Sequence, residues 1–263
     1  MLKLIWKESK MTSKITSVNN DIVKETVKLQ QRKYRDESGL FLLEGEKCIK
    51  EAIEYGIKLE HIFVAEGYDK FSAYNPTEVT EAVISKISTT TSAPRCVAVG
   101  NQLKREWNNK FKHIVLLEDI KDAGNLGTII RTSCAFGVDG IILYGDTVDL
   151  YNPKCVRASV GNLWKLPVFD IKNFSELEKL TKDFTPVSTL PKSDNTTYLN
   201  DYTPDGKLLL MFGTESCGLS DELKEFAQEN GRAITIEMNN SVESLNLSVS
   251  VGVILYKLFT NQR

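Results

Sequence analysis

The sequence predicts an α/β protein whose C-terminal part contains a parallel sheet. Two observations support this prediction. Between residues 113 and 260, short apolar runs of strand length alternate with amphipathic stretches of helical length, which is typical of βαβ units. Polar loops follow several of the apolar runs, at the edge where open α/β sheets bind ligands. With 263 residues the chain is long enough for two domains.

The composition is that of a soluble globular protein, with 41% hydrophobic residues, 26% charged residues and a net charge of −2. No apolar run approaches the roughly 20 residues that span a bilayer. The five cysteines are scattered without a Cys-x-x-Cys pair and there are two histidines, so we expect no metal site. Scattered thiols without a recognisable secretion signal favour the cytoplasm.

A small α/β domain is expected at residues 1–105, followed by a second domain at 106–263. The first has predicted helices at 21–35 and 46–55 and predicted strands at 40–43, 59–65 and 95–99. The run Asn-Pro-Thr-Glu at 75–78 has the pattern of a helix start. The charged segment 101–112 is interpreted as the linker.

The N-terminal end is basic although the whole chain is not. Residues 1–40 contain nine Lys or Arg against five acidic residues. The cluster Arg32, Lys33 and Arg35 is therefore our candidate for contact with phosphate groups. The alternative is a solvated helix face with no partner.

The second domain is expected to alternate strands and helices throughout. Predicted strands lie at 113–118, 139–144, 165–170, 207–213 and 232–237, and predicted helices at 126–136, 152–159, 175–183, 220–228 and 246–260. Ser175 and Glu178 have the spacing of a capping box. Residues 186–203 show no clear pattern.

The first motif is LLEDIKDAGNLGTIIRTSCAFG, at residues 116–137. Asn125 is a suitable N-cap for the helix that follows the loop. Arg131, further along that helix, is a long cation that can reach back toward the loop. This pattern predicts a site for an anionic or nucleotide-like ligand. On this stretch alone, a helix cap and a simple salt bridge explain the same two residues equally well.

Two further loops follow predicted strands. In FGTESCGLSDEL, Gly213 and Gly218 have the glycine spacing of a P-loop, but Leu219 stands where the phosphate-binding lysine is required, which argues against nucleotide hydrolysis. Glu215 lies inside this loop. In IEMNNSVESLNLSVS, Ser241, Ser244 and Asn246 precede a long apolar helix. A surface turn and a helix cap are the alternative interpretations of these polar residues.

Together the three motifs resemble those of the SpoU (TrmH-type) branch of the knotted SPOUT family, which comprises RNA methyltransferases that use S-adenosyl-L-methionine (AdoMet). The segment RASVGNLWKLPV resembles the family's conserved stretch between the first two motifs. The N-terminal run QRKYRDESGLFLLEGEKCIKEA resembles a substrate-binding domain like ribosomal protein L30e. The resemblance implies a trefoil knot in the parallel-sheet domain, a homodimer, and AdoMet as cofactor.

The resemblance also implies roles for individual residues. Four residues match the positions that hold AdoMet: Gly213, Ile236, Met238 and Leu245. Five match the catalytic set: Asn125, Arg131, Glu215, Ser244 and Asn246. In the family, Arg131 corresponds to the residue that activates the ribose 2′-hydroxyl. The sequence departs from the family pattern at Glu237 and Asn240, where Pro and Gly are usual, and at the Ser-Cys pair 216–217, where a Gly is common.

The expected activity is therefore transfer of a methyl group from AdoMet to a ribose 2′-hydroxyl of RNA. Ribosomal RNA of the 23S type is favoured by the N-terminal domain, and single-stranded or looped segments are favoured because the ribose must be accessible. No metal is needed, since the leaving group departs neutral, and no membrane is involved. The alternatives are a tRNA 2′-O-methyltransferase, a base-methylating relative, and an inactive RNA-binding or ribosome-assembly factor. A dinucleotide-binding oxidoreductase is disfavoured because no Gly-x-Gly-x-x-Gly follows a predicted strand.

Overall fold

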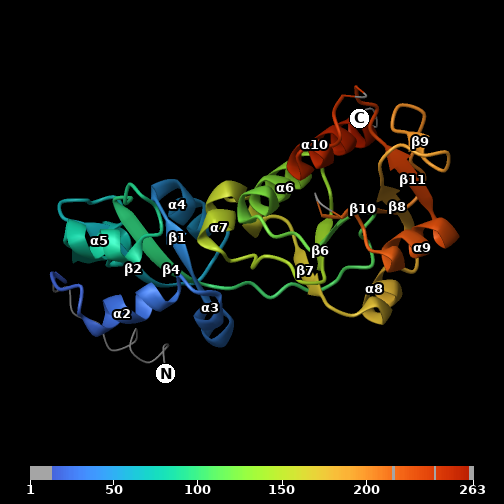
Figure 1. Ribbon diagram of the computed structural model, residues 1–263. Helices are drawn as coiled ribbons and strands as arrows, with labels where there is room; N and C mark the ends of the chain where they lie inside the picture. Colours follow the sequence, from blue (N-terminus) through green and yellow to red (C-terminus); the bar gives the residue numbers. More distant parts are fainter. Residues whose placement is uncertain (1–13, 215–216, 240, 261–263) are drawn as a thin grey trace. The chain divides into compact units, whose positions relative to one another are not determined.

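The computed structural model describes residues 14–214, 217–239 and 241–260, and the chain divides into two compact units (Figure 1). Unit 1 comprises the described residues up to Lys104 together with Asp149–Trp164. Unit 2 comprises Arg105–Val148 and the described residues from Lys165 onward. The segment Asp149–Trp164, which the sequence analysis assigned to the second domain, packs as part of unit 1. In the described part, none of the helices combines the length and apolar composition that a bilayer span requires.

Unit 1 is built on a four-stranded sheet with the order β1-β4-β2-β3. The strands are β1 (Leu40–Glu44), β2 (Leu59–Ala65), β3 (Thr77–Val79) and β4 (Cys96–Asn101). Strands β1 and β2 pair antiparallel with β4, while β3 pairs parallel with β2. The helices are α2 (Asp21–Lys28), α3 (Arg32–Ser38), α4 (Glu46–Glu54), α5 (Glu81–Ile87) and α7 (Pro153–Ser159), with 3-10 turns at Ser72–Tyr74 and Asn162–Trp164.

Strand β1 is buried on both faces. Leu40 and Leu42 belong to a core shared with α2 and α5. Because successive side chains of a strand alternate between its faces, Phe41 points to the other side. There it contacts the rings of Tyr151 and Trp164, with centroids 4.7 and 5.5 Å away. The segment that contains α7 thus supplies the second layer on this sheet.

Two helix predictions in unit 1 are wrong in detail. The predicted helix at 21–35 is two helices, α2 and α3, separated by a turn at residues 29–31. The predicted helix start at 75–78 is wrong, because Thr77–Val79 forms β3, with Thr77 and Val79 buried next to β2. Thr80 precedes the true helix, α5. Pairing with β2 therefore overrides the local Asn-Pro signal.

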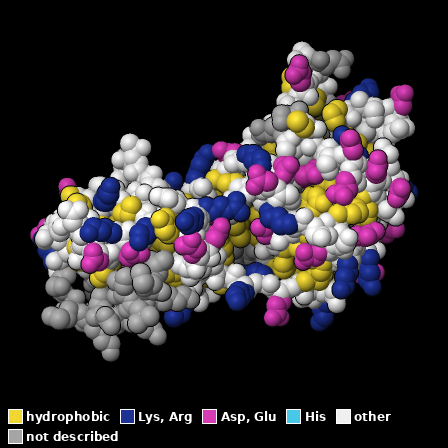
Figure 2. Space-filling view, turned by 60° about the horizontal axis from the view of Figure 1, so that its bottom comes forward, with side chains coloured by type: hydrophobic (Ala, Val, Ile, Leu, Met, Phe, Trp, Pro, Cys, Tyr) yellow, Lys and Arg dark blue, Asp and Glu magenta, His cyan; other side chains and the backbone are white. Residues whose placement is uncertain are grey.

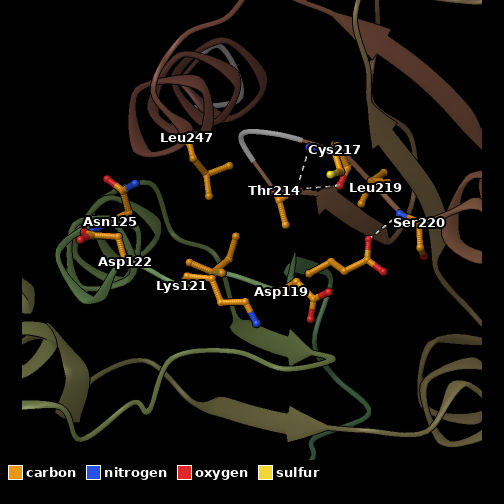
Figure 3. Close-up of a pocket in the computed structure, with 12 residues that line it drawn as sticks. Asp119, Lys121, Asp122, Asn125, Thr214, Cys217, Leu219, Ser220 and Leu247 are labelled. Carbon is orange, nitrogen blue, oxygen red and sulfur yellow. Dashed lines mark hydrogen bonds between the residues drawn. The ribbon is translucent and has the colours of Figure 1, made fainter.

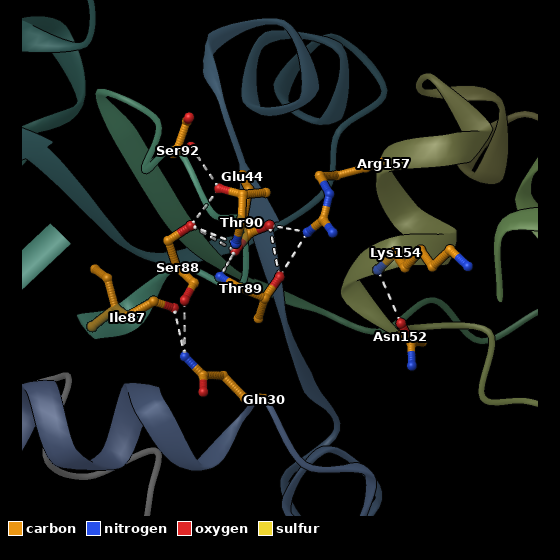
Figure 4. A network of polar contacts seen from close by, with 10 residues as sticks. All are labelled: Gln30, Glu44, Ile87, Ser88, Thr89, Thr90, Ser92, Asn152, Lys154 and Arg157. Carbon is orange, nitrogen blue, oxygen red and sulfur yellow. Dashed lines mark hydrogen bonds and ion pairs between the residues drawn. The ribbon is translucent and has the colours of Figure 1, made fainter. Parts of the chain in front are cut away.

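A buried polar network attaches α7 to β1 (Figure 4). The Glu44 side chain is only 2% exposed and forms an ion pair with Arg157 of α7. The same carboxylate accepts hydrogen bonds from the Thr89 backbone N–H at 2.5 Å, the Thr89 hydroxyl at 3.0 Å and the Ser88 hydroxyl at 3.3 Å. Because every oxygen of the carboxylate is satisfied, the buried charge is tolerated.

A second buried ion pair fixes the start of the same segment. The Arg35 side chain is 1% exposed, and its Nη2 lies 2.5 Å from Oδ2 of Asp149, whose side chain is 9% exposed. Arg35 Nη1 also donates to the Leu29 carbonyl at 2.8 Å. Asp149 Oδ1 in turn accepts from the Tyr151 backbone N–H at 2.9 Å. Arg35 and Asp149 thus link α3 to a segment more than a hundred residues later in the chain.

Unit 2 contains a seven-stranded sheet with the order β7-β6-β5-β10-β8-β11-β9. The strands are β5 (His113–Glu118), β6 (Gly140–Tyr144), β7 (Val168–Ile171), β8 (Thr185–Thr189), β9 (Thr197–Tyr198), β10 (Leu208–Phe212) and β11 (Arg232–Thr235). All the pairings are parallel, so the predicted parallel sheet is confirmed. Strands β8 and β9 lie in the stretch for which no element was predicted.

Four helices cover this sheet: α6 (Ala123–Ala135), α8 (Phe174–Thr181), α9 (Asp221–Asn230) and α10 (Leu247–Phe259). Helices α8 and α9 share a core with Leu116 of β5 and Met211 of β10, whereas α6 and α10 pack along each other on the opposite side (Figure 1). The expected capping box is wrong, since Asn173 caps α8 by accepting from the Ser175 backbone N–H.

Candidate functional site

The site lies where the strand order of unit 2 reverses. From β5 the chain continues to β6 and β7 on one side, whereas β10, β8, β11 and β9 lie on the other. At such a point the loops after neighbouring strands diverge and leave a crevice at the carboxyl ends, where open α/β sheets bind ligands. Two hollows open at this edge, which we call the β10–β11 cleft and the β5–β10 cavity.

The β10–β11 cleft has a volume of about 490 Å³. All four residues expected to hold the cofactor line it, as does one of the expected catalytic residues; these are Gly213, Ile236, Met238, Leu245 and Ser244. Its remaining apolar lining consists of Leu190 and Pro191 directly after β8, Phe212 of β10, Ile234 of β11, and Leu247 and Ile254 of α10. The sequence analysis missed the contribution of β8, because nothing in residues 186–203 marked a strand there.

The backbone at Gly213, Thr214 and Gly218 forms one wall of the cleft. Thr214 and Gly218 bond to each other in both directions, each N–H donating to the other's carbonyl at 3.0 Å. Gly218 has a positive φ of 69°. A Cβ on Gly213 would lie 2.0 Å from the Gly218 carbonyl carbon. Only glycine therefore allows the two backbones to approach this closely. Glu215, an expected catalytic residue, lies outside the described residues.

The β5–β10 cavity has a volume of about 540 Å³ (Figure 3). It shares several lining residues with the cleft. Its lining comes from the loops that follow β5 and β10 and from the start of α10. Glu118, at the end of β5, is 5% exposed and accepts from the Ser220 backbone N–H at 2.7 Å. This bond ties the β5 and β10 loops together. Asp119 and Lys121 also line the cavity, and the sequence analysis named neither of them as a site residue.

Tyr144, at the end of β6, is bonded both to α9 and to the residue that follows β5. The Tyr144 hydroxyl donates to Glu222 at 2.7 Å. Burial, and then this hydrogen bond, raise the pKa of Tyr144, so the phenol stays protonated and keeps its bond to the carboxylate at neutral pH. The backbone N–H of Asp119 donates to the Tyr144 carbonyl at 3.0 Å. The part of the cavity lined by Glu118 and Asp119 is therefore held in place by the ends of β5 and β6.

Asn125 and Asn246 meet at this site. Nδ2 of Asn246 donates to Oδ1 of Asn125 at 3.2 Å, and Asn125 lines the β5–β10 cavity. The expectation that Asn125 caps α6 is wrong, since the cap is Asp122, which accepts from the Asn125 backbone N–H. Asn246 is the N-cap of α10 and accepts from the Ser248 backbone N–H at 3.0 Å. The structure thus brings together one residue from the first motif and one from the third.

Arg131 does not join this pair. It lies at an exposed position of α6 and lines neither hollow. The geometry of the helix explains this, because six residues turn an α-helix by about 600°, so that Asn125 and Arg131 leave it about 120° apart. Asn125 faces α10 and the cavity, whereas Arg131 faces solvent.

The three basic residues expected to contact RNA differ in their surroundings. Arg32 and Lys33 have side chains 46% and 73% exposed at the start of α3. Arg35 does not lie on the surface; it is buried against Asp149, so its expected place in a basic surface cluster is corrected. In the view of Figure 2, basic and acidic side chains alternate over the surface rather than forming a face of one sign. That pattern agrees with the net charge of −2.

The fold and the site define an α/β protein that binds ligands at the carboxyl edge of a parallel sheet, with its polar residues supplied by three loops. Residues 112–256 match the model of the SpoU rRNA Methylase family, and residues 20–98 match that of the MRM3-like substrate binding domain. The chain belongs to the SpoU rRNA methylase family.

Proteins similar to this chain span nearly its whole length. An uncharacterized tRNA/rRNA methyltransferase of Synechocystis is 32% identical, with 92% of each chain covered. The 23S rRNA (guanosine(2553)-2′-O)-methyltransferase of Bacillus subtilis is 27% identical, over 93% of this chain and 98% of its own. The crystal structure of an AdoMet-bound rRNA methyltransferase from Sinorhizobium meliloti superimposes with a TM-score of 0.83 at 28% identity, covering 93% of this chain and 96% of its own.

Proposed function

We propose that the protein transfers a methyl group from AdoMet to a ribose 2′-hydroxyl of ribosomal RNA. One observation carries this proposal: a cleft suited to the cofactor shares a wall with a cavity that is lined by Asn125, whose side chain accepts a hydrogen bond from Asn246. The printed names of the relatives support the reaction and the substrate class, since the Bacillus subtilis protein is a 23S rRNA 2′-O-methyltransferase.

The residues of the β10–β11 cleft fit AdoMet. Its apolar lining suits the faces of an adenine ring, and Gly213 lets the backbone come close to a ligand. The methionine part of the cofactor carries an ammonium and a carboxylate, and the cleft offers one charge of each sign, Glu243 and Lys224. We assign Gly213, Ile236, Met238 and Leu245 to holding the cofactor there.

When bound, AdoMet supplies an electrophilic methyl group on a positively charged sulfur. The chain must then align the ribose oxygen with that methyl group and assist removal of the hydroxyl proton. We propose that Asn125, oriented by Asn246, hydrogen-bonds the ribose from the cavity side. Ser244, which lines the cleft, and Glu215 complete the polar set that the family resemblance implies.

Two roles of Arg131 fit this reaction. As a base it would have to lose its proton, and because a guanidinium stays protonated far above neutral pH, forming the neutral guanidine carries a large free-energy cost. As a cation it would clamp the phosphate next to the ribose and stabilise the developing oxyanion without that cost. The cost favours the charged clamp.

A homodimer and a trefoil knot are part of the proposal. Helix α10 exposes three large apolar side chains, Val249, Val253 and Tyr256, at 49%, 39% and 62%. Their spacing places them along one stripe of the helix, next to α6, which carries Arg131. A second copy seated on this stripe would cover apolar surface and bring Arg131 of one protomer to the cavity of the other.

A tRNA substrate remains the second candidate, since the Synechocystis relative is named a tRNA/rRNA methyltransferase.

Binding of AdoMet by the purified protein, measured by titration calorimetry, tests the cofactor assignment. We expect saturable binding of one AdoMet per chain. Met238→Ala removes apolar contact from the cleft and is expected to weaken that binding about tenfold, since burial of such a side chain is worth roughly 1.5–3 kcal/mol. Val242→Ala is the matched control, because Val242 is 46% exposed on the same loop. No binding by the unaltered protein would contradict the assignment and favour an inactive RNA-binding factor.

A further inference from the structure

The β5–β10 cavity and the β10–β11 cleft share a wall. Thr214, Cys217, Gly218 and Leu247 line both hollows. If AdoMet occupies the cleft, as the proposed function holds, the methyl acceptor must approach from the cavity. An RNA nucleotide presenting its 2′-oxygen at the shared wall then places its base in the β5–β10 cavity.

We propose that the cavity receives the base of the target nucleotide and that Asp119 reads it, which selects guanosine. Asp119 follows β5 directly and lines the cavity beside Lys121 (Figure 3). Its role is to set base specificity; the transfer itself is assigned to other residues.

The Asp119 carboxylate is held firmly in place. Its Oδ1 accepts from the Asp146 backbone N–H at 2.6 Å. A Cβ on Gly145 would lie 2.5 Å from the same oxygen, so the Gly145 backbone packs directly against the carboxylate. The Asp119 backbone has a positive φ of 52°, a conformation that Asp and Asn tolerate better than other side chains. A carboxylate held in one orientation can discriminate between ligands, because it cannot rotate to suit a base whose hydrogen-bonding groups do not match it.

Asp119 also has a carboxylate oxygen available to a ligand, whereas Glu118 is only 5% exposed and Asp122 caps α6. Among the described residues that line the cavity, Glu118 is bonded to the Ser220 backbone and Asp122 to the Asn125 backbone. Lys121, the ammonium at the rim, is bonded to Asp146. Within the part of the chain that the structure describes, no group donates to Oδ2 of Asp119. Each carboxylate oxygen has two lone pairs, so Oδ1 can also accept a second bond.

The chemistry of the cavity favours a base with donor groups over a phosphate. Three carboxylates against one ammonium repel an anion. On its pairing edge guanine has two adjacent N–H donors, N1–H and the N2 amino group, which match the two oxygens of a carboxylate. Adenine and cytosine offer one amino group next to an acceptor, and uracil offers one imino group between two acceptors. Single-stranded RNA exposes these edges to proteins.

Asp119→Asn tests the inference, because it keeps the shape and the bond to Asp146 but replaces one acceptor oxygen with a donor. The assay incubates protein and radiolabelled AdoMet with total RNA from cells that lack the gene, then digests the RNA and identifies the labelled nucleosides. We expect the label in 2′-O-methylguanosine. For Asp119→Asn we expect a loss of at least about tenfold in kcat/KM, mainly through a higher KM, as for loss of a two-bond base contact. AdoMet affinity should not change.

Asp170→Asn is the matched control, because Asp170 is an exposed acid on β7 outside both hollows. It should behave like the unaltered protein. Label in 2′-O-methyladenosine, 2′-O-methylcytidine or 2′-O-methyluridine would overturn the base assignment and leave the proposed function standing. Equal kinetics of Asp119→Asn and the unaltered protein would overturn the role of Asp119. Label in no 2′-O-methylnucleoside would overturn the proposed function and this inference with it.

Discussion

Replacing Arg131 with alanine is expected to lower methyl transfer at least about 10²–10³-fold, as when one preorganised donor to a developing oxyanion is removed. AdoMet binding should be unchanged, because Arg131 does not line the β10–β11 cleft. The measurement pairs a single-turnover methylation assay with AdoMet calorimetry. Thr128→Ala, at another exposed position of α6, is the matched control. Transfer by Arg131→Ala at the rate of the unaltered protein would remove Arg131 from the site.

Arg131→Lys separates the two roles of the arginine. A clamp that stays charged is partly replaced by lysine, so RNA binding should weaken while the shape of the pH–rate profile is kept. A lysine acting as the base, with an ordinary pKa near 10.4, would instead shift that profile. A shifted profile would therefore contradict the clamp.

Mixing two inactive variants tests whether Arg131 acts across a dimer. The partner for Arg131→Ala is Ser250→Trp, whose indole would fill the cofactor cleft, since Ser250 lines it from α10. If Arg131 serves the second copy, the mixture regains part of the activity, because some mixed dimers hold one complete site. A mixture as inactive as its two components would place Arg131 at the site of its own chain.

Replacing Asp149 with alanine is expected to destabilise unit 1 by about 3–5 kcal/mol, because the change leaves a buried guanidinium without its partner. Arg35 is 1% exposed and Asp149 is its only carboxylate contact among the described residues. Urea unfolding followed by tryptophan fluorescence measures the effect, since Trp164 is buried in the same unit against Phe41. A loss of this size moves the midpoint by more than about 1 M urea.

Lys154→Ala is the control for this experiment, because Lys154 is an exposed residue of α7 in the same segment. It should change the midpoint little.

The double variant Arg35→Met with Asp149→Leu removes both charges and should recover most of the lost stability. A small effect of Asp149→Ala would show that α7 is held mainly by Glu44 and the aromatic contacts.

The sheet of unit 2 was predictable where strands are continuous apolar runs. Strands β6 and β10 are buried along their whole length and β5 from its second residue onward, and an apolar run is the signal of a strand buried on both faces. Strand β8 pairs with both β10 and β11 although it contains Pro186. A proline argues against a central strand, so no local pattern could have revealed β8 or its share of the cofactor cleft.

The wrong N-cap prediction for α6 arose because two nearby polar residues could each cap that helix. Asp122 and Asn125 are both good caps three residues apart, and the sequence alone does not say which one lies outside the helix. The six-residue step to Arg131 was visible, but its outward direction follows only once the start of α6 is fixed. Arg35 and Asp149 lie 114 residues apart in the sequence, and no local pattern indicates that they pair. The motif residues Gly213, Ile236, Met238 and Leu245 were named from the resemblance to the SpoU family; strand-end loops alone indicated only that a site lies at one edge of the sheet.

The central claim is methyl transfer to a ribose hydroxyl, and the most direct measurement is the site of the transferred methyl group. Ribosomal RNA from cells lacking the gene is incubated with the purified protein and isotope-labelled AdoMet, digested to nucleosides and analysed by mass spectrometry. We predict one labelled nucleoside with the methyl group on its ribose 2′-oxygen, absent when Arg131→Ala replaces the unaltered protein. A labelled methyl group on a base, or no label in any nucleoside, would contradict the proposed function.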